Sequence, residues 1–477
     1  MKYLLQPWQH QLEIIEKAKD RNHYAIFAEV GTGKSGMLVN ILRHKFYEQK
    51  KVLRTIILCP PIVRNNWLSE FKLHSKVSDR VVVLKGPGKK RLATFEKYAF
   101  GDAFGPLYDM KNDCIFVTNY ESLSMKELFH AFKKWQPECL ALDESHRCKS
   151  FQAKRTKLAI ELADLCRYKY LLTGTPILNT PMDIWSQFRI LDGGETFDKN
   201  FWAFKARYFY DKNSGMPAQK YFPDWRPRPG IADTFNSLIY AKSSRVLKKD
   251  CLDLPPLVRE TRSINLEDDQ KRMYEEMKKN FVAYLDDKAC VATLALTKAL
   301  RLQQITSGFW RDDAGKDFEF TKNNRLDALM EVLDEIVPSG HKVIIWACFA
   351  KNYEQIMKRI GDKYKACLLV GGMSDKEREG SLDTFAKDGE ILVANQQAGG
   401  IGINLTMSSY SIYYSRNFSL EADLQSEARN YRGGSEIHEK VTRIDLLAPG
   451  TIDEIIHDAL SRKENLANSI LKLKDRL

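Results

Sequence analysis

The segment Ala28-Glu-Val-Gly-Thr-Gly33-Lys34-Ser35 follows an apolar run, Tyr24 to Ala28, and precedes a stretch whose apolar residues recur with helical spacing. A glycine loop between a strand and a helix turns backbone N–H groups and a helix N-terminus toward phosphates. We expect Gly31, Thr32 and Gly33 to form this loop. Lys34 would reach the β and γ phosphates of ATP, and the Ser35 hydroxyl would ligate Mg²⁺.

A second candidate half of this site is the strand-like run that ends in Asp143 and Glu144. The carboxyl ends of parallel strands meet at one edge of a sheet, so Asp143 is expected near the glycine loop. Asp143 would hold Mg²⁺ through water, and Glu144 would orient or deprotonate the attacking water. Thr173-Gly-Thr-Pro176 ends the next strand, where it could sense the γ phosphate. A surface acidic turn and a plain strand-ending turn are the alternatives.

Far along the chain, Gln425-Ser-Glu-Ala-Arg429-Asn-Tyr-Arg432 offers guanidinium charge but no phosphate loop. Neither this segment nor the glycine loop can complete phosphoryl transfer alone. We therefore expect two lobes that close on one ATP, although a pair of helix-surface arginines would show the same spacing.

Short runs rich in β-branched and aromatic residues alternate with amphipathic stretches in both halves of the chain, which is typical of βα units around a parallel sheet. The expected strands are residues 24–28, 55–59, 80–84, 114–118, 140–143 and 170–173, then 343–347, 366–370, 391–394, 411–414 and 441–446. This pattern predicts an α/β protein with two RecA-like, doubly wound parallel-sheet lobes. The domain prediction is an ATP-binding lobe at 1–195, a helical and aromatic insertion with linker at 196–320, and a second lobe at 321–477.

Composition limits the functional class. The 477 residues exceed what one core usually supports, and 74 Lys plus Arg against 62 Asp plus Glu give a net charge of +12. This charge favours a polyanionic partner such as nucleic acid, although basic proteins of other classes exist. The nine cysteines show no metal-ligand spacing, so we expect them to be reduced core residues. Their odd count also favours a reducing compartment. No apolar run of membrane-spanning length is present, so we expect a cytoplasmic protein without a membrane partner.

Several further segments occur in a fixed order. They are Gln9 within Pro7-Trp-Gln-His, Cys59 to Trp67, Val117 to Glu121, Asp143 to His146, Leu172 to Trp185, Gly371-Gly372 with Glu377-Arg378, Ala398 to Thr406, and Gln425 to Arg432. In this order the chain resembles superfamily 2 helicases, and within them the SNF2-like branch. Ser415 and Gly433-Gly434-Ser435 depart from the pattern of many eukaryotic members, and the chain is similar instead to short phage and prophage members.

The resemblance implies an ATP-dependent and Mg²⁺-dependent DNA translocase or helicase that tracks DNA without reading its sequence. Gln9 would read adenine, Gly402 would contribute to the nucleotide site, and Arg429 and Arg432 would act as arginine fingers. The implied coupling residues are His146, Thr173, Thr175 and Gln425, and for His146 an isolated core histidine is the alternative. The implied strand contacts are Arg64, Asn65, Thr118, Asn119, Gly372, Gln397 and Gly399.

Duplex or branched DNA is the expected substrate, in fork remodelling or branch migration. An RNA-stimulated ATPase, a translocase that does not separate strands, a restriction-system translocase subunit and an inert clamp remain alternatives. The segment from Lys199 to Arg228 interleaves aromatic and basic residues. These could stack on bases at a fork, or the aromatic residues could pack a small subdomain while the basic residues face solvent.

Overall fold

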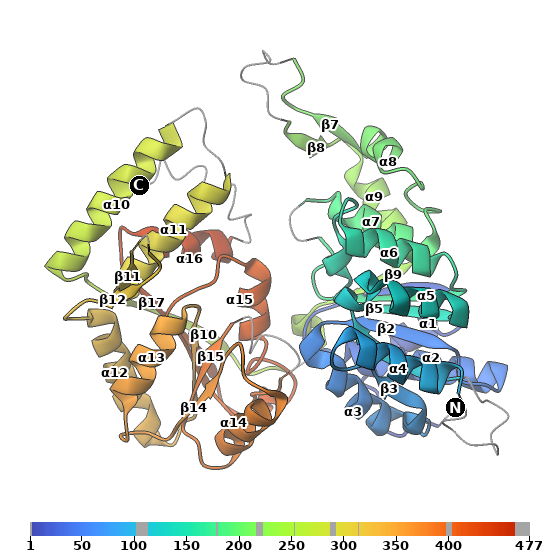
Figure 1. Ribbon diagram of the computed structural model, residues 1–477, viewed down its shortest axis with the longest axis horizontal. Coiled ribbons are helices and arrows are strands. Elements are labelled where there is room, and N and C mark those ends of the chain that lie inside the picture. The colour runs from blue at the N-terminus through green and yellow to red at the C-terminus, as the bar shows by residue number, and fades with distance from the viewer. Residues whose placement is uncertain are drawn as a thin grey trace. The chain divides into compact units, whose positions relative to one another are not determined.

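The computed structural model describes residues 2–101, 113–177, 180–215, 223–251, 253–286, 292–312, 314–396 and 403–462. The chain divides into two compact units, Met1–Leu252 and Asp253–Leu477, each built on its own parallel sheet (Figure 1). Among the described residues, no helix is long and apolar enough to cross a membrane.

The first unit contains a seven-stranded sheet in the order β3-β4-β2-β5-β6-β1-β9, with every neighbouring pair parallel. Its strands are β1 (His23–Ala28), β2 (Thr55–Cys59), β3 (Val81–Val83), β4 (Ile115–Asn119), β5 (Cys139–Asp143), β6 (Tyr168–Thr173) and β9 (Ser243–Val246). The helices are α1 (Gln9–Ala18), α2 (Lys34–Gln49), α3 (Arg64–His74), α4 (Gly88–Ala99), α5 (Lys126–Trp135), α6 (Lys154–Ala163), α7 (Asp183–Asp192), α8 (Phe201–Tyr208) and α9 (Ala232–Tyr240). β1, β2 and β5 are almost completely buried, which is expected of parallel strands covered by helices on both faces.

The second unit contains a six-stranded parallel sheet in the order β10-β17-β16-β13-β15-β14. Its strands are β10 (Leu257–Ser263), β13 (Val343–Ala347), β14 (Ala366–Leu369), β15 (Ile391–Asn395), β16 (Tyr410–Tyr413) and β17 (Val441–Leu447). The helices are α10 (Asp268–Asp286), α11 (Ala292–Thr306), α12 (Asn324–Ile336), α13 (Ala350–Ile360), α14 (Asp375–Lys387), α15 (Leu420–Glu427) and α16 (Ile452–Ser461), and β11 (Phe309–Arg311) pairs with β12 (Asp317–Glu319) as a hairpin. Separate apolar clusters cover the two faces of this sheet.

Two RecA-like lobes are therefore confirmed, and each strand expected from the sequence is present with small differences at its ends. The sequence pattern missed β9 and β10, which lie at sheet edges. β10 is largely exposed and carries the charged residues Arg259, Glu260 and Arg262, so it lacks the apolar run that marks a buried strand.

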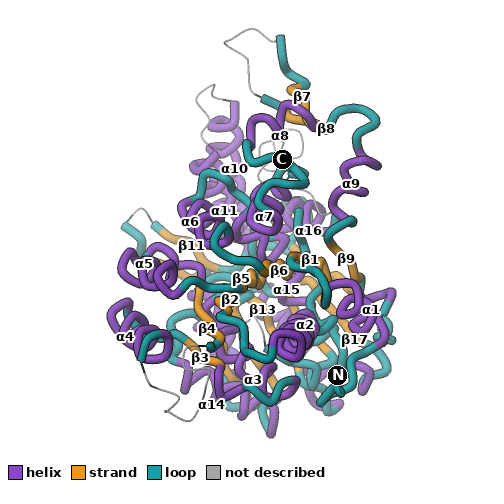
Figure 2. The backbone as a smooth tube through the Cα atoms, turned by 90° about the vertical axis from the view of Figure 1, so that its right-hand side faces the viewer, coloured by secondary structure: helices purple, strands orange, loops and turns teal. Residues whose placement is uncertain are grey.

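The segment 196–320 does not form one body. Its first part, with α8, α9 and the antiparallel hairpin of β7 (Phe209–Asp211) and β8 (Trp225–Pro227), belongs to the first unit. The hairpin extends from that unit away from its sheet (Figures 1 and 2). Its second part, with β10, α10 and α11, belongs to the second unit, where a cluster around Leu302, Ile305 and Ile456 joins α11 to α16.

The described cysteines are unpaired, and most are buried. Burial raises the pKa of Cys114, Cys148 and Cys166 to about 12. These thiols therefore stay protonated at neutral pH, as expected of core residues.

Candidate active site

The glycine loop joins the buried end of β1 to the first turn of α2. Gly31 and Gly33 have φ angles of 92° and 83°. The backbone angle at Gly33 favours glycine, and a Cβ there would lie 2.2 Å from Gln11 Nε2, so the Gln11 side chain would have to move. Thr32 is fully buried, and its hydroxyl donates to Glu29 O at 2.8 Å.

Lys34 lies at the start of α2 and is half-buried. Its Nζ donates to Ala28 O at 2.8 Å, which holds the ammonium over the glycine loop. Ser35 follows in the same turn, where a helix N-terminus favours an anion. The loop thus has the backbone shape and the charge of a phosphate site.

The N-terminal segment contacts this loop through residues next to Gln9. Gln9 is exposed, and its Nε2 donates to Glu13 Oε1 at 3.1 Å within α1. His10 Nε2 and Gln11 Nε2 instead donate to Thr32 O, at 3.0 and 3.1 Å. No role is predicted for His10 or Gln11 from the sequence, because neither residue carries a motif signal of its own.

Three adjacent strands bring the remaining residues of this half-site together. β5, β6 and β1 are neighbours in that order, and Asp143, Thr173 and Ala28 are their last residues. Parallel strands end at one edge, so the tips of these three strands and the glycine loop share it. Gly174, just after β6, lies so close to β1 that a Cβ on it would be 3.4 Å from Ala28 O.

Asp143 is buried and fixed by two aromatic residues. Trp67 Nε1 donates to Asp143 Oδ2 at 3.1 Å, and the Tyr120 hydroxyl donates to Asp143 O at 2.7 Å. Burial and then the neighbouring Glu144 raise the pKa of Asp143 to about 7, while Lys34 and the Trp67 indole act in the opposite direction. A nearby cation would favour the charged carboxylate, and the oxygens of Asp143 and Ser35 are the donor atoms that Mg²⁺ prefers.

Glu144, His146 and Thr173 form one hydrogen-bonded cluster. Glu144 adopts a left-handed conformation, with φ at 56°, which is unusual for a side chain of this kind. Its Oε2 lies 3.4 Å from both Thr173 Oγ1 and His146 Nδ1, and His146 Nδ1 lies 2.8 Å from Thr173 Oγ1. The Thr175 N–H also donates to Thr173 Oγ1, at 3.2 Å. The structure thus places Glu144, His146, Thr173 and Thr175 side by side.

Gln187 links the two segments that build this cluster, and no sequence pattern indicates it. It is fully buried on α7 and accepts a bond from Ser145 Oγ at 2.7 Å. Its Nε2 donates to Pro176 O at 2.6 Å. The loops after β5 and β6 are therefore tied to one side chain.

The expected strand contacts in the first unit differ in exposure. Arg64 is half-buried, and its guanidinium donates to Pro61 O and Leu84 O, both at 2.9 Å, while Asn65 beside it is half-buried. Thr118 and Asn119 are buried, and their side chains bond to Ser122. Arg91, which the sequence analysis missed, also donates to Asn119 and Ser122. Thr118 and Asn119 thus support their loop from inside.

The second unit holds the arginine segment next to a buried network of charges. Arg443 on β17 bonds to Asp423 and Glu427 of α15 at 2.8 and 2.9 Å, and it pairs with Asp445. Its guanidinium also lies 3.8 Å from the ring centre of Tyr413. Buried charges that are paired and hydrogen-bonded in this way fix geometry, so the network positions α15 and the arginines that follow it.

Arg429 and Arg432 differ in exposure. Arg429 is buried, its Nη1 donates to Ile403 O at 3.4 Å, and its carbonyl accepts from Leu405 N at 3.0 Å. Arg432 is half-buried. Gln425 is buried in α15, where its Nε2 donates to Glu421 at 3.0 Å. Gly372 is exposed with φ at 86°, whereas Gln397, Gly399 and Gly402 lie outside the described residues.

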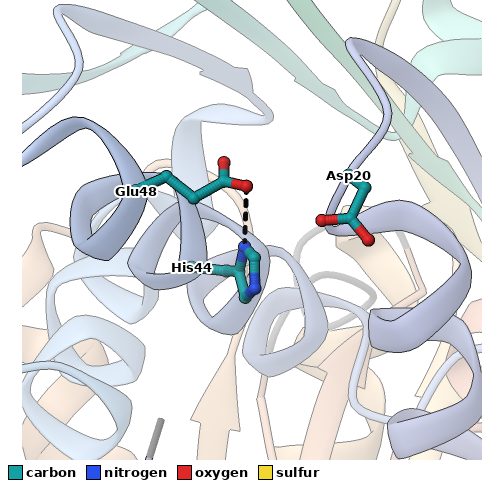
Figure 3. A group of neighbouring side chains, drawn as sticks. All are labelled: Asp20, His44 and Glu48. Carbon is teal, nitrogen blue, oxygen red and sulfur yellow. Dashed lines mark ion pairs between the residues drawn. The ribbon is translucent and has the colours of Figure 1, made fainter.

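A separate group of possible metal ligands lies on the first unit. Asp20 follows α1, and His44 and Glu48 belong to α2 (Figure 3). Their ligand atoms lie within 4.8 Å of one another, and His44 Nδ1 is 3.8 Å from Glu48 Oε1. Both carboxylates are exposed, which is common without a metal, and no metal is assigned to them.

Removal of the Trp67 indole that donates to Asp143 is expected to weaken Mg²⁺ binding at the proposed site. We predict that Trp67→Phe raises the Mg²⁺ concentration for half-maximal ATPase by about 10-fold, because loss of a residue that orients a metal ligand typically costs 10- to 100-fold. The control is Trp135→Phe, which alters a buried tryptophan of the same unit that packs on Phe95 and Phe116. Equal Mg²⁺ dependence of the two variants would contradict this role. Mg²⁺-dependent binding of a fluorescent ATP analogue provides a second measurement.

Comparison with known proteins identifies the family. The model of the SNF2-related domain matches residues 10–308, and that of the helicase conserved C-terminal domain matches residues 324–434. A putative ATP-dependent helicase/translocase of Bacillus subtilis is 25% identical over 458 residues, which cover 93% of this chain and 46% of the relative. An uncharacterized ATP-dependent helicase of Mycoplasma genitalium is 24% identical over 468 residues, covering 96% of this chain and 41% of the relative.

This chain thus spans less than half the length of those two relatives. The putative protein p41 of Acyrthosiphon pisum secondary endosymbiont phage 1 is 22% identical over 485 residues, which cover 98% of each chain. The solved SWI2/SNF2 ATPase core of Sulfolobus solfataricus with double-stranded DNA is 21% identical, with a TM-score of 0.44, over 99% of this chain and 95% of that one. Since the SNF2-related model alone matches well over half of the residues, the chain belongs to the SNF2-related family of helicase-like proteins.

Proposed function

We propose that this chain is an ATP-driven translocase that moves on DNA. The observation that carries the proposal is the shared edge of β5, β6 and β1, where Lys34, Asp143 and the Glu144–His146–Thr173 cluster lie next to the glycine loop. This edge has a phosphate loop, a buried carboxylate for Mg²⁺ and a carboxylate for water. Two relatives that match over most of this chain are named as ATP-dependent helicases, which supports the same activity.

In this proposal the glycine loop of the first unit binds ATP, and arginines of the second unit take part in hydrolysis. Ser35 and Asp143 would hold Mg²⁺, which when bound would neutralise charge on the phosphate oxygens. Glu144 would accept a proton from the attacking water, and Arg429 and Arg432 would bring positive charge to the transition state. His146, Thr173, Thr175 and Gln425 would couple this site to the rest of the motor, with Gln9 and Gly402 at the nucleotide. Closure on ATP and reopening after hydrolysis would step the protein along DNA.

DNA is the proposed partner because the chain carries a net charge of +12. The side chains of Thr118 and Asn119 are buried, so they offer no base readout. Contacts to phosphates would be independent of sequence and would weaken steeply with salt. Arg64, Asn65, Gly372, Gln397 and Gly399 are proposed to take part in them. The test compares ATPase rates with blunt duplex DNA, forked DNA and RNA of equal length. Stimulation by RNA alone would overturn the proposal in favour of an RNA-stimulated ATPase.

Branched DNA is the finer form of the proposal, in fork remodelling or branch migration. The interleaved aromatic and basic residues between Lys199 and Arg228 motivate this finer form. The test is branch migration of a four-way junction and strand separation on a fork, measured in parallel with ATPase. A motor that hydrolyses ATP on both substrates but converts neither would instead be a translocase that does not separate strands.

Lys34→Ala is expected to weaken ATP binding by about 10- to 100-fold, because a hydrogen bond to a charged group is worth about 1.5–3 kcal/mol. Lys34 Nζ donates to the backbone carbonyls of Ala28 and Glu29, at 2.8 and 3.5 Å, so the bonds lost with it are to backbone atoms, although its loss also removes a charge that lowers the pKa of Asp143. Titration with a fluorescent ATP analogue measures the effect. Lys17→Ala, which removes an exposed lysine of α1, is a control for lost charge, and ATP affinity equal to wild type in Lys34→Ala would contradict the role.

A further inference from the structure

The hairpin β7–β8 and the adjacent helix α8 carry a surface that the ATP site does not use. We define the aromatic-basic surface as Trp202 and Lys205 of α8 together with Trp225 of β8. Lys205 Nζ lies 3.5 Å from the ring centre of Trp225 and 5.2 Å from that of Trp202. The three side chains therefore form one continuous array on a part of the first unit that extends away from the sheet (Figures 1 and 2).

Packing accounts fully for most of the aromatic residues here but only in part for Trp202, whose ring lies edge-on to Phe151 and Phe201, with 6.0 and 5.5 Å between ring centres. Phe204, Tyr208 and Phe209 are buried in the core of the first unit, where they contact Phe197 and Phe235. This confirms the packing interpretation for those three residues. Trp202 is 62% exposed, although its helix already has a complete buried face. A tryptophan left largely in solvent beside a cation forgoes part of the burial energy of a large apolar side chain.

The charge of the surrounding segment indicates which kind of partner this surface binds. Between residues 199 and 230 the described residues include the cations Lys199, Lys205, Arg207, Lys212, Arg226 and Arg228, and only the acids Asp211 and Asp224. The exposed Tyr210 lies opposite Arg226 in the hairpin register, and Arg226 is ion-paired with Asp224 at 2.8 Å. An exposed ring with adjacent cations suits a chain of stacked bases joined by phosphates.

We propose that the aromatic-basic surface binds an unpaired DNA strand at a branch. Trp202 is the platform on which a base stacks, and Lys205, held against Trp225, pairs with the neighbouring phosphate. This inference rests on the proposed DNA function and adds a site for the single-stranded arm. Since the bases of a blunt duplex are stacked and paired, the surface would distinguish forked from blunt DNA.

The test measures binding by fluorescence anisotropy without ATP, using a labelled fork with single-stranded arms of about 15 nucleotides, a typical site size, and a blunt duplex. Trp202→Ala is expected to weaken fork binding by about 5- to 100-fold, the range found for one stacked base, and to leave duplex binding unchanged. Trp202→Phe, which keeps a ring, should retain most of the affinity. Lys205→Ala should weaken fork binding and reduce its salt dependence by about one phosphate contact. Tyr240→Ala, which removes a 44% exposed ring of α9, is the matched control.

The outcomes separate this inference from the proposed function. The inference is overturned if Trp202→Ala binds the fork as tightly as wild type, or if the variant loses equal affinity for fork and duplex. In either case an interaction with protein would be the use of the surface. An ATPase activity that no DNA stimulates overturns the proposed motor function, even if Trp202→Ala binds forked DNA more weakly than wild type. Preference of the wild type for the fork, abolished in Trp202→Ala and kept in Tyr240→Ala, supports the inference.

Discussion

Arg432→Ala is expected to lower DNA-stimulated ATP turnover by about 10³- to 10⁵-fold, the range found for arginine fingers. The fixed guanidinium would meet charge that develops on the transferred phosphoryl group, so its removal acts on the transition state more than on ATP binding. Arg432 is half-buried, whereas Arg429 is buried and bonds to Ile403 O. Arg429→Ala should therefore lose stability as well as activity.

Steady-state ATPase assays with saturating DNA, together with thermal melts, measure both effects. Arg432→Lys keeps the charge but lacks the planar fork, so we expect it to recover only part of the rate. The control is Arg359→Ala on α13, which removes an exposed arginine of the same unit. Turnover of Arg432→Ala close to that of the control would contradict the proposed role of Arg432 in hydrolysis.

Glu144→Gln is expected to reduce turnover by about 10²- to 10⁴-fold, the usual contribution of a positioned general base. Glutamine has nearly the same shape and can still bond to Thr173, but it cannot accept a proton from water. ATP affinity should remain close to that of wild type, since Lys34 and the glycine loop are unchanged. The variant should therefore trap ATP.

Single-turnover hydrolysis and binding of a fluorescent ATP analogue distinguish this result from general damage to the fold. Glu127→Gln on α5 removes an exposed carboxylate of the same unit and should leave the rate unaltered. ATPase of Glu144→Gln equal to wild type would contradict the assignment of the general base. Loss of both binding and turnover would instead point to a structural role for the left-handed turn at Glu144.

The sequence determined the fold and the glycine loop because both depend on local pattern. Buried parallel strands such as β1 and β5 are continuous apolar runs, and a loop such as Gly31 to Gly33 needs glycine for its own backbone angles. Adjacent edges of a parallel sheet then place Asp143 near that loop without further information. Edge strand β10 was missed because it is charged and exposed, so its pairing with β17 leaves no mark on the local pattern.

Only the tertiary structure decided which side chains act together across long separations in the chain. Trp67 and Tyr120 meet Asp143 because β2, β4 and β5 lie in one sheet, and Gln187 joins the loops after β5 and β6 from α7. The same holds for Arg443 and α15, and for Trp202, whose exposure depends on which face of α8 the core of the first unit covers. Hydrogen bonds and burial of this kind depend on packing in three dimensions, whereas residue type and spacing report only what neighbouring residues do to one another.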